Sequence, residues 1–346
     1  MSRRDGVVVR LANSGRGWNL VASARPWTMA PLVATLARMS LVRSALLRAS
    51  RSEWLAGQFR KHEFTRRAVK SFLPGEELGA ALDAAATLAG EELGSVITNL
   101  GERVTTRGEA AAVREHYLGA LDAITARSLP TQLSVKLTHL GLEAGRDACA
   151  SDVARLAAHA GTVGSFVWID MEESHYVDAT LGIFREIRGS HTNVGLCLQA
   201  YLHRTPMDIE TLLPLQPSIR LVKGAYREPA ARALVRRQDI DAAYLSMGRR
   251  LLDQAARGHG MPVFGTHDAR LIEALRMHAS GRRLAPRAYE VHMLYGIATT
   301  MQRALAAGGT KVRTLISYGT NWFPWYMRRL AERPANMWFV VQNVFR

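Results

Sequence analysis

The sequence is poor in cysteine, and this excludes a fold stabilised mainly by disulfide bonds. Cys149 and Cys197 are the two cysteines among 346 residues, too few for the disulfide framework of a small secreted protein. Cys197 lies in an apolar run, so we expect a buried thiol and a reducing, cytoplasmic environment. No apolar run is long enough to span a bilayer, and no early apolar segment with a cleavage site predicts a secretory signal.

Several catalytic patterns are also missing. No H-E-x-x-H or C-x-x-C spacing predicts a metal site, so none is expected. The G-x-S-x-G turn of covalent hydrolases is absent as well. Phosphate chemistry lacks a clear cation site. These absences leave redox chemistry with an organic cofactor as the class that the remaining residues favour.

Acidic residues are scarce relative to basic ones. Lys and Arg total 45 against 30 for Asp and Glu, a formal charge of +15, which favours a nucleotide cofactor, an acidic membrane surface or nucleic acid as partner. Much of the excess lies in residues 1–75, interpreted as a basic helical extension, with residues 1–20 poorly ordered or a small appendage. Apolar spacing over 27–47 predicts an amphipathic helix. This helix either lies on an anionic membrane surface or packs on the main domain with its basic face in water.

Residues 76–346 show a regular alternation of short apolar runs and helical stretches. Several runs are continuous, such as VGLCL at 194–198, which is typical of strands buried on both faces. About eight strand–helix units in this length predict a distorted (β/α)8 barrel of the TIM type. A doubly wound open sheet is the alternative, but no G-x-G-x-x-G follows any predicted strand. The predicted strands are 94–100, 132–137, 166–171, 194–201, 219–226, 261–267, 288–294 and 313–319. The predicted helices include 110–126, 148–158, 178–187, 241–258 and 299–307.

Polar side chains cluster at or near the ends of these predicted strands. Active sites of such barrels gather at the C-terminal strand ends. A single charged strand end is more often a satisfied structural group, but polar groups at five consecutive ends imply a large polar ligand across the mouth. The residues in question are Lys136, Asp170, Gln199, Tyr201, Arg220, Lys223, Tyr226, Thr266, His267, Glu290 and His292.

The types of these residues suit a flavin dinucleotide. Arg220, Lys223 and His267 offer positive charge and donors for a diphosphate or an electron-rich ring. Gln199 offers both a donor and an acceptor, which suits the amide-like edge of such a ring.

An arginine pair near the C-terminus suits an anionic substrate group. Arg328 and Arg329 lie in an apolar segment bounded by Pro324 and Pro334, which suit the first turn and the end of a helix. Adjacent helical residues point about 100° apart, so both arginines cannot share one solvent face. A solvated basic helix end is the alternative. The position after the eighth strand favours a forked clamp on a carboxylate.

Seven segments, in order and at barrel spacing, resemble one known family. They are SVKLT (134–138), IDME (169–172), LQAY (198–201), RLVKGAY (220–226), THD (266–268), YG (318–319) and RRLAERP (328–334). From about residue 75 to its end, the chain is similar to the proline dehydrogenase family of flavoenzymes, in its monofunctional bacterial form.

The resemblance implies a distorted barrel that holds FAD. It implies hydride transfer to the flavin from the ring carbon beside the nitrogen of proline, with pyrroline carboxylate as product. Electrons would then pass to a membrane quinone, which makes the basic N-terminal segment a plausible contact with the inner face of the plasma membrane.

The resemblance also implies roles for individual residues. Asp170 and Arg220 are expected to be catalytic, with Arg220 near the reactive nitrogen of the flavin. Glu102 matches a glutamate that gates the site by pairing with an arginine of the last helix. The expected flavin contacts are Met171, Gln199, Arg220, Lys223, Gly224, Ala225, Thr266 and His267. The expected substrate contacts are Lys136, Asp170, Tyr226, Leu294, Leu315, Arg328 and Arg329.

Two positions depart from the family pattern. Leu315 stands where the family usually has a tyrosine in its eighth strand, and it removes a hydroxyl and an aromatic wall. His292 replaces a common glutamine in the seventh strand. Both changes are expected near the cofactor or the substrate ring. They leave open a substituted or larger cyclic amino acid, such as a hydroxyproline, as the alternative to proline.

Two other classes of protein compete with a flavoenzyme. A non-catalytic barrel could bind nucleic acid through its basic surface, but the charge is biased to the N-terminal region and lacks interleaved aromatic residues, so no nucleic-acid partner is predicted. A flavin-binding relative without turnover is opposed by the presence of Arg328 and Arg329.

Overall fold

The computed structural model describes the backbone of residues 10–13, 18–21 and 71–332, and the side chains of residues 71–327. In the first two stretches, β1 (Arg10–Asn13) and β2 (Trp18–Val21) form an antiparallel pair. The helix predicted over 27–47 lies outside the described residues.

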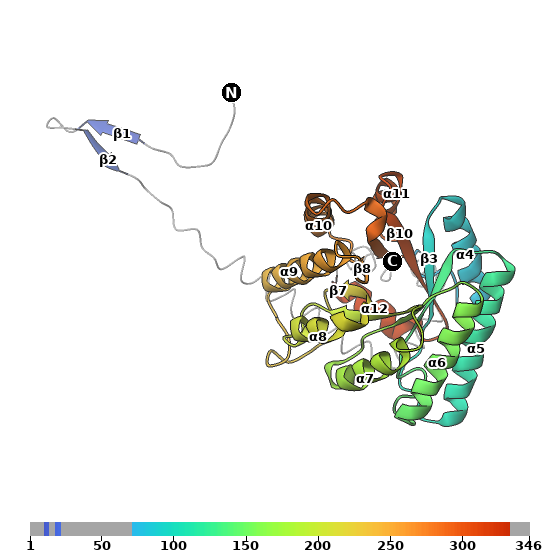
Figure 1. The fold of residues 1–346 in the computed structure, drawn as a ribbon. Coiled ribbons are helices and arrows are strands. Elements are labelled where there is room, and N and C mark those ends of the chain that lie inside the picture. The colour runs from blue at the N-terminus through green and yellow to red at the C-terminus, as the bar shows by residue number, and fades with distance from the viewer. Residues whose placement is uncertain (1–9, 14–17, 22–70, 333–346) are drawn as a thin grey trace, which may run out of the picture.

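Eight parallel strands close into a barrel in the order β10-β3-β4-β5-β6-β7-β8-β9 (Figure 1). The TIM-type fold predicted from the sequence is therefore confirmed. Strand β10 pairs with β3 on one side and with β9 on the other, which closes the sheet. The strands are β3 (Gly94–Asn99), β4 (Thr131–Val135), β5 (Val167–Ile169), β6 (Val194–Gln199), β7 (Ser218–Val222), β8 (Met261–Gly265), β9 (Glu290–Leu294) and β10 (Lys311–Tyr318).

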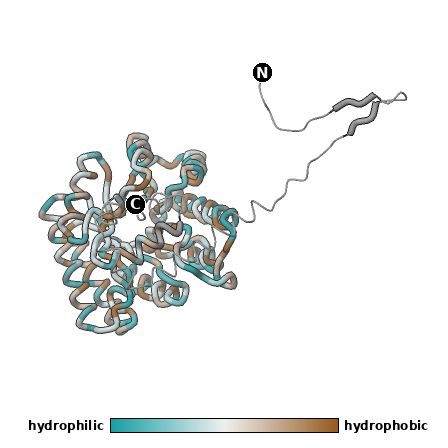
Figure 2. Tube along the Cα trace, turned by 180° about the vertical axis from the view of Figure 1, so that it is seen from behind, coloured by the Kyte–Doolittle hydropathy of each residue, from teal (hydrophilic) through white to brown (hydrophobic). Residues whose placement is uncertain are grey.

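Helices surround the barrel, and α5 and α10 begin at a residue whose side chain caps the helix. Helix α5 begins after Thr106, whose hydroxyl accepts a hydrogen bond from the Glu109 amide at 3.3 Å. Along the helices, Figure 2 alternates between hydrophilic and hydrophobic colours, as amphipathic helices do. The helices are α4 (Leu78–Gly90), α5 (Arg107–Ala126), α6 (Arg146–Thr162), α7 (Val177–Arg188), α8 (Thr205–Leu212), α9 (Arg237–Ala255), α10 (Ala269–Gly281), α11 (Thr299–Ala307) and α12 (Trp322–Glu332). Short 3-10 turns are η1 (Ser174–Tyr176), η2 (Leu213–Leu215) and η3 (Pro286–Ala288).

The barrel is distorted where its two ends meet. Helix α4, which precedes the first barrel strand, packs against both β10 and β3. In a regular barrel the helix after the last strand covers this seam. Because α4 covers it here, α12 is free to lie elsewhere. In the view of Figure 1, α12 falls inside the outline of the outer helices.

The barrel interior has a small apolar layer of its own. Val96, Trp168 and Val263 are fully buried there, and Phe166, Met261 and Leu315 pack against them. The larger cluster lies between the strands and the outer helices. Strand residues of one parity therefore point into the barrel and those of the other parity point to the helices.

Seven of the eight barrel strands are shorter than the sequence predicted, and the difference moves site residues into loops. Strand β6 ends at Gln199 and β7 at Val222, so Tyr201, Lys223 and Tyr226 belong to the following loops. Gly224, with φ +118°, adopts a conformation that ends the extended backbone after β7. No helix within the described residues is long and apolar enough to cross a membrane.

Candidate active site

The C-terminal ends of the strands bring most of the predicted site residues to one end of the barrel. Lys136 directly follows β4, Asp170 follows β5, and Gln199 is the last residue of β6. Thr266 and His267 follow β8, and Leu294 ends β9. All eight strands are parallel, so these side chains share one rim.

Arg220 is the most deeply buried basic residue among the described residues of this rim. Its side chain is 4% exposed, and its Nη2 donates to the Asp170 carboxylate and to Ser134 Oγ, the latter at 2.7 Å. Ser134 Oγ in turn donates to Asp170 Oδ1 at 3.0 Å. The other nitrogen, Nη1, is buried without a hydrogen-bond partner in the described part of the chain. An unpaired guanidinium nitrogen in such a place requires an acceptor that the protein itself does not supply.

Gln199 likewise has a buried polar atom without a hydrogen-bond partner in the described part of the chain. Its Nε2 donates to the backbone oxygens of Met171 at 3.0 Å and Glu172 at 3.3 Å, which fixes the orientation of the amide. Among the described residues, its Oε1 is buried and has no hydrogen-bond partner. A bound ring with an N–H group would satisfy this oxygen.

The loop after β7 combines a cation with a close backbone approach. Lys223 Nζ contacts Asp241 Oδ1 at 2.5 Å and Asp268 Oδ2 at 3.3 Å. A Cβ added to Gly224 would lie 2.2 Å from the ring of Tyr201, so this position accepts only glycine. The Tyr201 hydroxyl donates to the backbone oxygen of Tyr226 at 3.3 Å, and Ala225 lies between Gly224 and Tyr226 in this held loop.

The residues after β8 are oriented by their neighbours. Thr266 Oγ1 accepts a hydrogen bond from the Asp268 amide at 3.1 Å. His267 Nε2 accepts one from the Leu294 amide at 2.9 Å, so this ring carries its proton on Nδ1. The bond ties the ends of β8 and β9 together.

Glu172 is a functional candidate that the sequence reasoning did not assign. It is buried, and burial raises its pKa from an ordinary value of 4.5 to about 7, although Thr138 donates to it from its amide at 3.0 Å and its hydroxyl at 2.5 Å. Ser134 and Trp168 were missed as well. Their signal is strand parity, because Ser134 lies two residues before Lys136 and Trp168 two before Asp170 on the inward side.

His292 is buried within the barrel. Its Nε2 contacts Glu290 Oε2 at 3.1 Å. Its ring packs edge-on against Trp168 with 5.5 Å between centroids. It follows Glu290 by two residues and precedes Leu294 by two, so it lies one layer below the strand ends, and its place near the cofactor or the substrate ring stays a prediction.

Leu315 lies on the inner surface of the barrel. It is opposite Leu294 on β9 and Val96 on β3, and it packs against the layer that contains Trp168. Its backbone oxygen accepts a hydrogen bond from Tyr295 at 3.0 Å.

The loop after β3, which carries Glu102, rests on His139. A Cβ at Gly101 would lie 2.1 Å from His139 Nε2, so the backbone directly contacts this ring. Burial, followed by the charge of Lys136, lowers the pKa of His139 to about 4, so the ring is neutral at pH 7.

The C-terminal helix predicted around the arginine pair is confirmed as α12. The side chains of Arg328 and Arg329 lie outside the described residues, so the clamp on a carboxylate remains a prediction.

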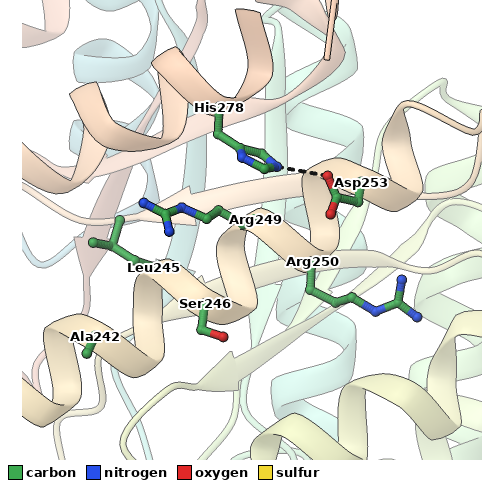
Figure 3. Close-up of a pocket in the computed structure, with 7 residues that line it drawn as sticks. All are labelled: Ala242, Leu245, Ser246, Arg249, Arg250, Asp253 and His278. Carbon is green, nitrogen blue, oxygen red and sulfur yellow. Dashed lines mark hydrogen bonds and ion pairs between the residues drawn. The ribbon is translucent and has the colours of Figure 1, made fainter. Parts of the chain in front are cut away.

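Other kinds of site lie elsewhere or are not found. No group of three or more His, Cys, Asp or Glu in the described residues is arranged to hold a metal ion. A cavity of about 580 Å³ lies on the outer side of α9 and α10, where Arg249, Asp253 and His278 are among its lining (Figure 3). His278 contacts Asp253 at 2.8 Å there. This groove shares no residue with the strand-end site.

Comparisons with known proteins agree with the fold and identify the family. The family model for proline dehydrogenase matches residues 81–342. Proline dehydrogenase 1 of Bacillus subtilis subsp. natto is 33% identical over 306 residues, which cover 88% of this chain and all of the relative. A proline dehydrogenase of Deinococcus radiodurans is 34% identical over 280 residues, covering 80% and 89%.

Solved structures share the fold at lower sequence identity. Proline utilization A from Bdellovibrio bacteriovorus, inactivated by N-propargylglycine, superposes with a TM-score of 0.73 and 20% identity over 85% of this chain and 36% of that one. The Bradyrhizobium japonicum protein gives 0.66 and 22% over 81% and 32%. This chain thus spans about a third of the length of each. From the family match and the relatives of similar length, the chain belongs to the proline dehydrogenase family.

Proposed function

We propose that the chain oxidises L-proline to 1-pyrroline-5-carboxylate with FAD as cofactor. The observation that carries the proposal is the pair of buried, unpartnered atoms at the strand ends, Arg220 Nη1 and Gln199 Oε1, in a chain of this family. One is a donor and the other an acceptor. Together they match the hydrogen-bonding edge of a flavin ring, which presents both kinds of group.

The residues present fit a flavin. Gly224 lets the backbone approach closely, and Lys223 supplies a cation beside it. When bound, the flavin would accept a hydride from the ring carbon beside the proline nitrogen. The residues proposed to hold it are Met171, Gln199, Arg220, Lys223, Gly224, Ala225, Thr266 and His267.

The part of this chain in the reaction is orientation and charge. Asp170 and Ser134 fix one end of the Arg220 guanidinium. The buried positive charge stabilises negative charge that develops on a bound ring, and it does so strongly because water is excluded there. Substrate oxidation also releases a proton. Lys136 directly follows β4 at the same rim, and Glu172 follows Asp170 by two residues, so both are titratable groups beside the proposed site.

The substrate would lie between the rim and α12. Arg328 and Arg329 are proposed to bind its carboxylate, and Glu102 is proposed to gate entry by pairing with an arginine of α12. Lys136, Asp170, Tyr226, Leu294 and Leu315 would surround its ring.

Anaerobic titration tests the function. Purified protein reconstituted with FAD should bleach on addition of L-proline, and a protein that takes up no flavin would contradict the proposal. Arg328→Met or Arg329→Met should raise KM about 30-fold or more with the flavin content unchanged, because losing one charge-assisted contact with a carboxylate costs about 2–5 kcal/mol. Arg303→Met, which breaks an exposed pair with Glu91, is the matched control. Unchanged kinetics in both α12 variants would refute the clamp.

A substituted proline is the second candidate substrate, because Leu315 on the inner surface is smaller than tyrosine and lacks its hydroxyl. Leu315→Tyr should shift the ratio of kcat/KM towards proline and away from ring-substituted analogues. If the ratio does not change, Leu315 does not select the substrate.

The proposed electron acceptor is a membrane quinone, with residues 1–75 as a peripheral contact on the inner face of the plasma membrane. Sedimentation with vesicles that contain anionic lipid tests the contact. Full-length protein should cosediment at low salt and be released at high salt, and no cosedimentation at low salt would oppose it.

A further inference from the structure

The guanidinium of Arg220 lies over the ring of Trp168. The Cζ atom is 5.0 Å from the ring centroid, within the range of a cation–π interaction. Trp168 is fully buried and Arg220 nearly so. Tryptophan is the strongest partner for such a contact, and the contact gains strength away from water.

The ring of Trp168 is itself fixed on three sides. Its Nε1 donates to Gln132 Oε1 at 2.7 Å. The edge-on ring of His292 packs against it at an interplanar angle of 80°. Gly195 lies opposite Trp168 on β6, and a Cβ there would come within 2.5 Å of the indole ring. The sequence thus leaves room for this large ring and then holds it in one place.

These contacts support Arg220 without neutralising it. Asp170 also holds the guanidinium, but its negative charge offsets part of the positive charge of Arg220. The indole ring of Trp168 holds the guanidinium without adding a charge. His292 is neutral as well, because burial lowers its pKa to about 4 despite its bond to Glu290. The layer beneath Arg220 therefore fixes its position while leaving its positive charge largely available above.

We propose that Trp168 is a positioning residue that supports Arg220 so that its charge stabilises the reduced flavin. This inference rests on the proposed function and adds to it a residue within the barrel that would act through Arg220. It predicts that the ring of residue 168 sets the reduction potential of the bound cofactor more than it sets substrate affinity.

The test compares Trp168→Leu and Trp168→Phe in full-length protein loaded with FAD. Phe166→Leu is the control, because the Phe166 ring packs on the Trp168 ring with 5.0 Å between their centroids. We expect Trp168→Leu to weaken stabilisation of the two-electron reduced flavin about tenfold, which lowers the midpoint potential by about 30 mV. Trp168→Phe should fall between this variant and the wild type. The KM for proline should change less than kcat, and Phe166→Leu should leave the potential unchanged.

Four outcomes would overturn the inference. An unchanged potential in folded, flavin-loaded Trp168→Leu would make Trp168 a packing residue only. If that variant does not fold, the decision falls to Trp168→Phe, where an unchanged potential has the same meaning. An equal shift in Phe166→Leu would show a general effect of packing. If instead the wild type takes up no flavin, the proposed function fails, and this inference fails with it.

Discussion

Two buried glutamates of the barrel, Glu172 near the rim and Glu290 at the start of β9, have pKa values that are shifted in opposite directions. Both side chains are almost inaccessible to water. Burial raises the pKa of Glu172 to about 7, and its donors from Thr138 are neutral. Burial also opposes ionisation of Glu290, but His292 and Arg313 donate to it and their effect lowers its pKa to about 2.

The difference shows that partners, more than depth, decide the charge of a buried carboxyl. Glu290 contacts Arg313 at 2.9 Å and Lys311 at 3.7 Å, so its charge is compensated where it lies. Glu172 receives hydrogen bonds but no contact from a cation in the described residues. Glu290, at the N-terminal end of β9 (the floor of the barrel), therefore stays ionised over the neutral pH range. Glu172, near the rim, is a carboxyl that titrates near neutral pH.

Glu290→Gln should have the largest effect on stability. It leaves the partly buried charge of Arg313 without its main partner, and breaking such a pair costs about 3 kcal/mol. Thermal unfolding measures this as a lower Tm. Glu91→Gln breaks an exposed pair with Arg303 and is the control, with no measurable change expected. Equal Tm values for Glu290→Gln and the wild type would contradict the claim that the ion pairs of Glu290 stabilise the barrel.

Glu172→Gln should flatten the pH dependence of stability. A pKa of about 7 in the folded state, against an ordinary 4.5, means that the folded protein keeps this proton longer than the unfolded chain does. The contribution of Glu172 to the free energy of unfolding is therefore complete below about pH 4.5. It is lost as the pH rises through 7, by up to about 3 kcal/mol.

Urea unfolding at several pH values checks this. Glutamine resembles the protonated acid, so the variant should lack this loss, and its stability relative to the wild type should increase between pH 5 and 7.5. Parallel profiles for the two proteins would show that Glu172 has an ordinary acidity.

Thr138→Val should have the smallest effect and should sharpen the same contrast. It removes the hydroxyl donor to Glu172 but keeps the bond from the backbone amide, so the pKa of Glu172 should rise further. The expected loss is about 1 kcal/mol, larger above pH 7 where the carboxylate is charged. Thr87→Val, at an exposed hydroxyl on α4, is the control. The measurement is the pH at which half of the pH-dependent stability is lost, and a downward shift would contradict the argument.

The fold could be predicted largely from the regular alternation of short apolar runs and helical stretches in the sequence. Continuous apolar runs such as 194–198 identify strands buried on both faces, and eight of them with helices between leave few other topologies. The strand ends could not be predicted to the residue. Apolar and β-branched residues continue past the last ladder bond, and only the backbone at Gly224 shows where β7 stops.

The rim of the site could be predicted because polar residues at strand ends leave a signal in the sequence. The layer beneath it could not. Trp168 looks like an ordinary core residue in the sequence, and its contacts with His292 and with Arg220 depend on the stagger of neighbouring strands.

The packing of α4 over the seam between β3 and β10 has a consequence for the order of folding. The helix and the last strand are separated by more than 200 residues, and Ser71 contacts the loop at Gly296 with no room for a side chain between them. Such distant pairings are slow to form. During synthesis α4 must wait, its apolar face uncovered, until β10 has left the ribosome. This protein is therefore expected to need protection from aggregation for most of its translation, and to fold with full cooperativity only when the two ends of the barrel have met.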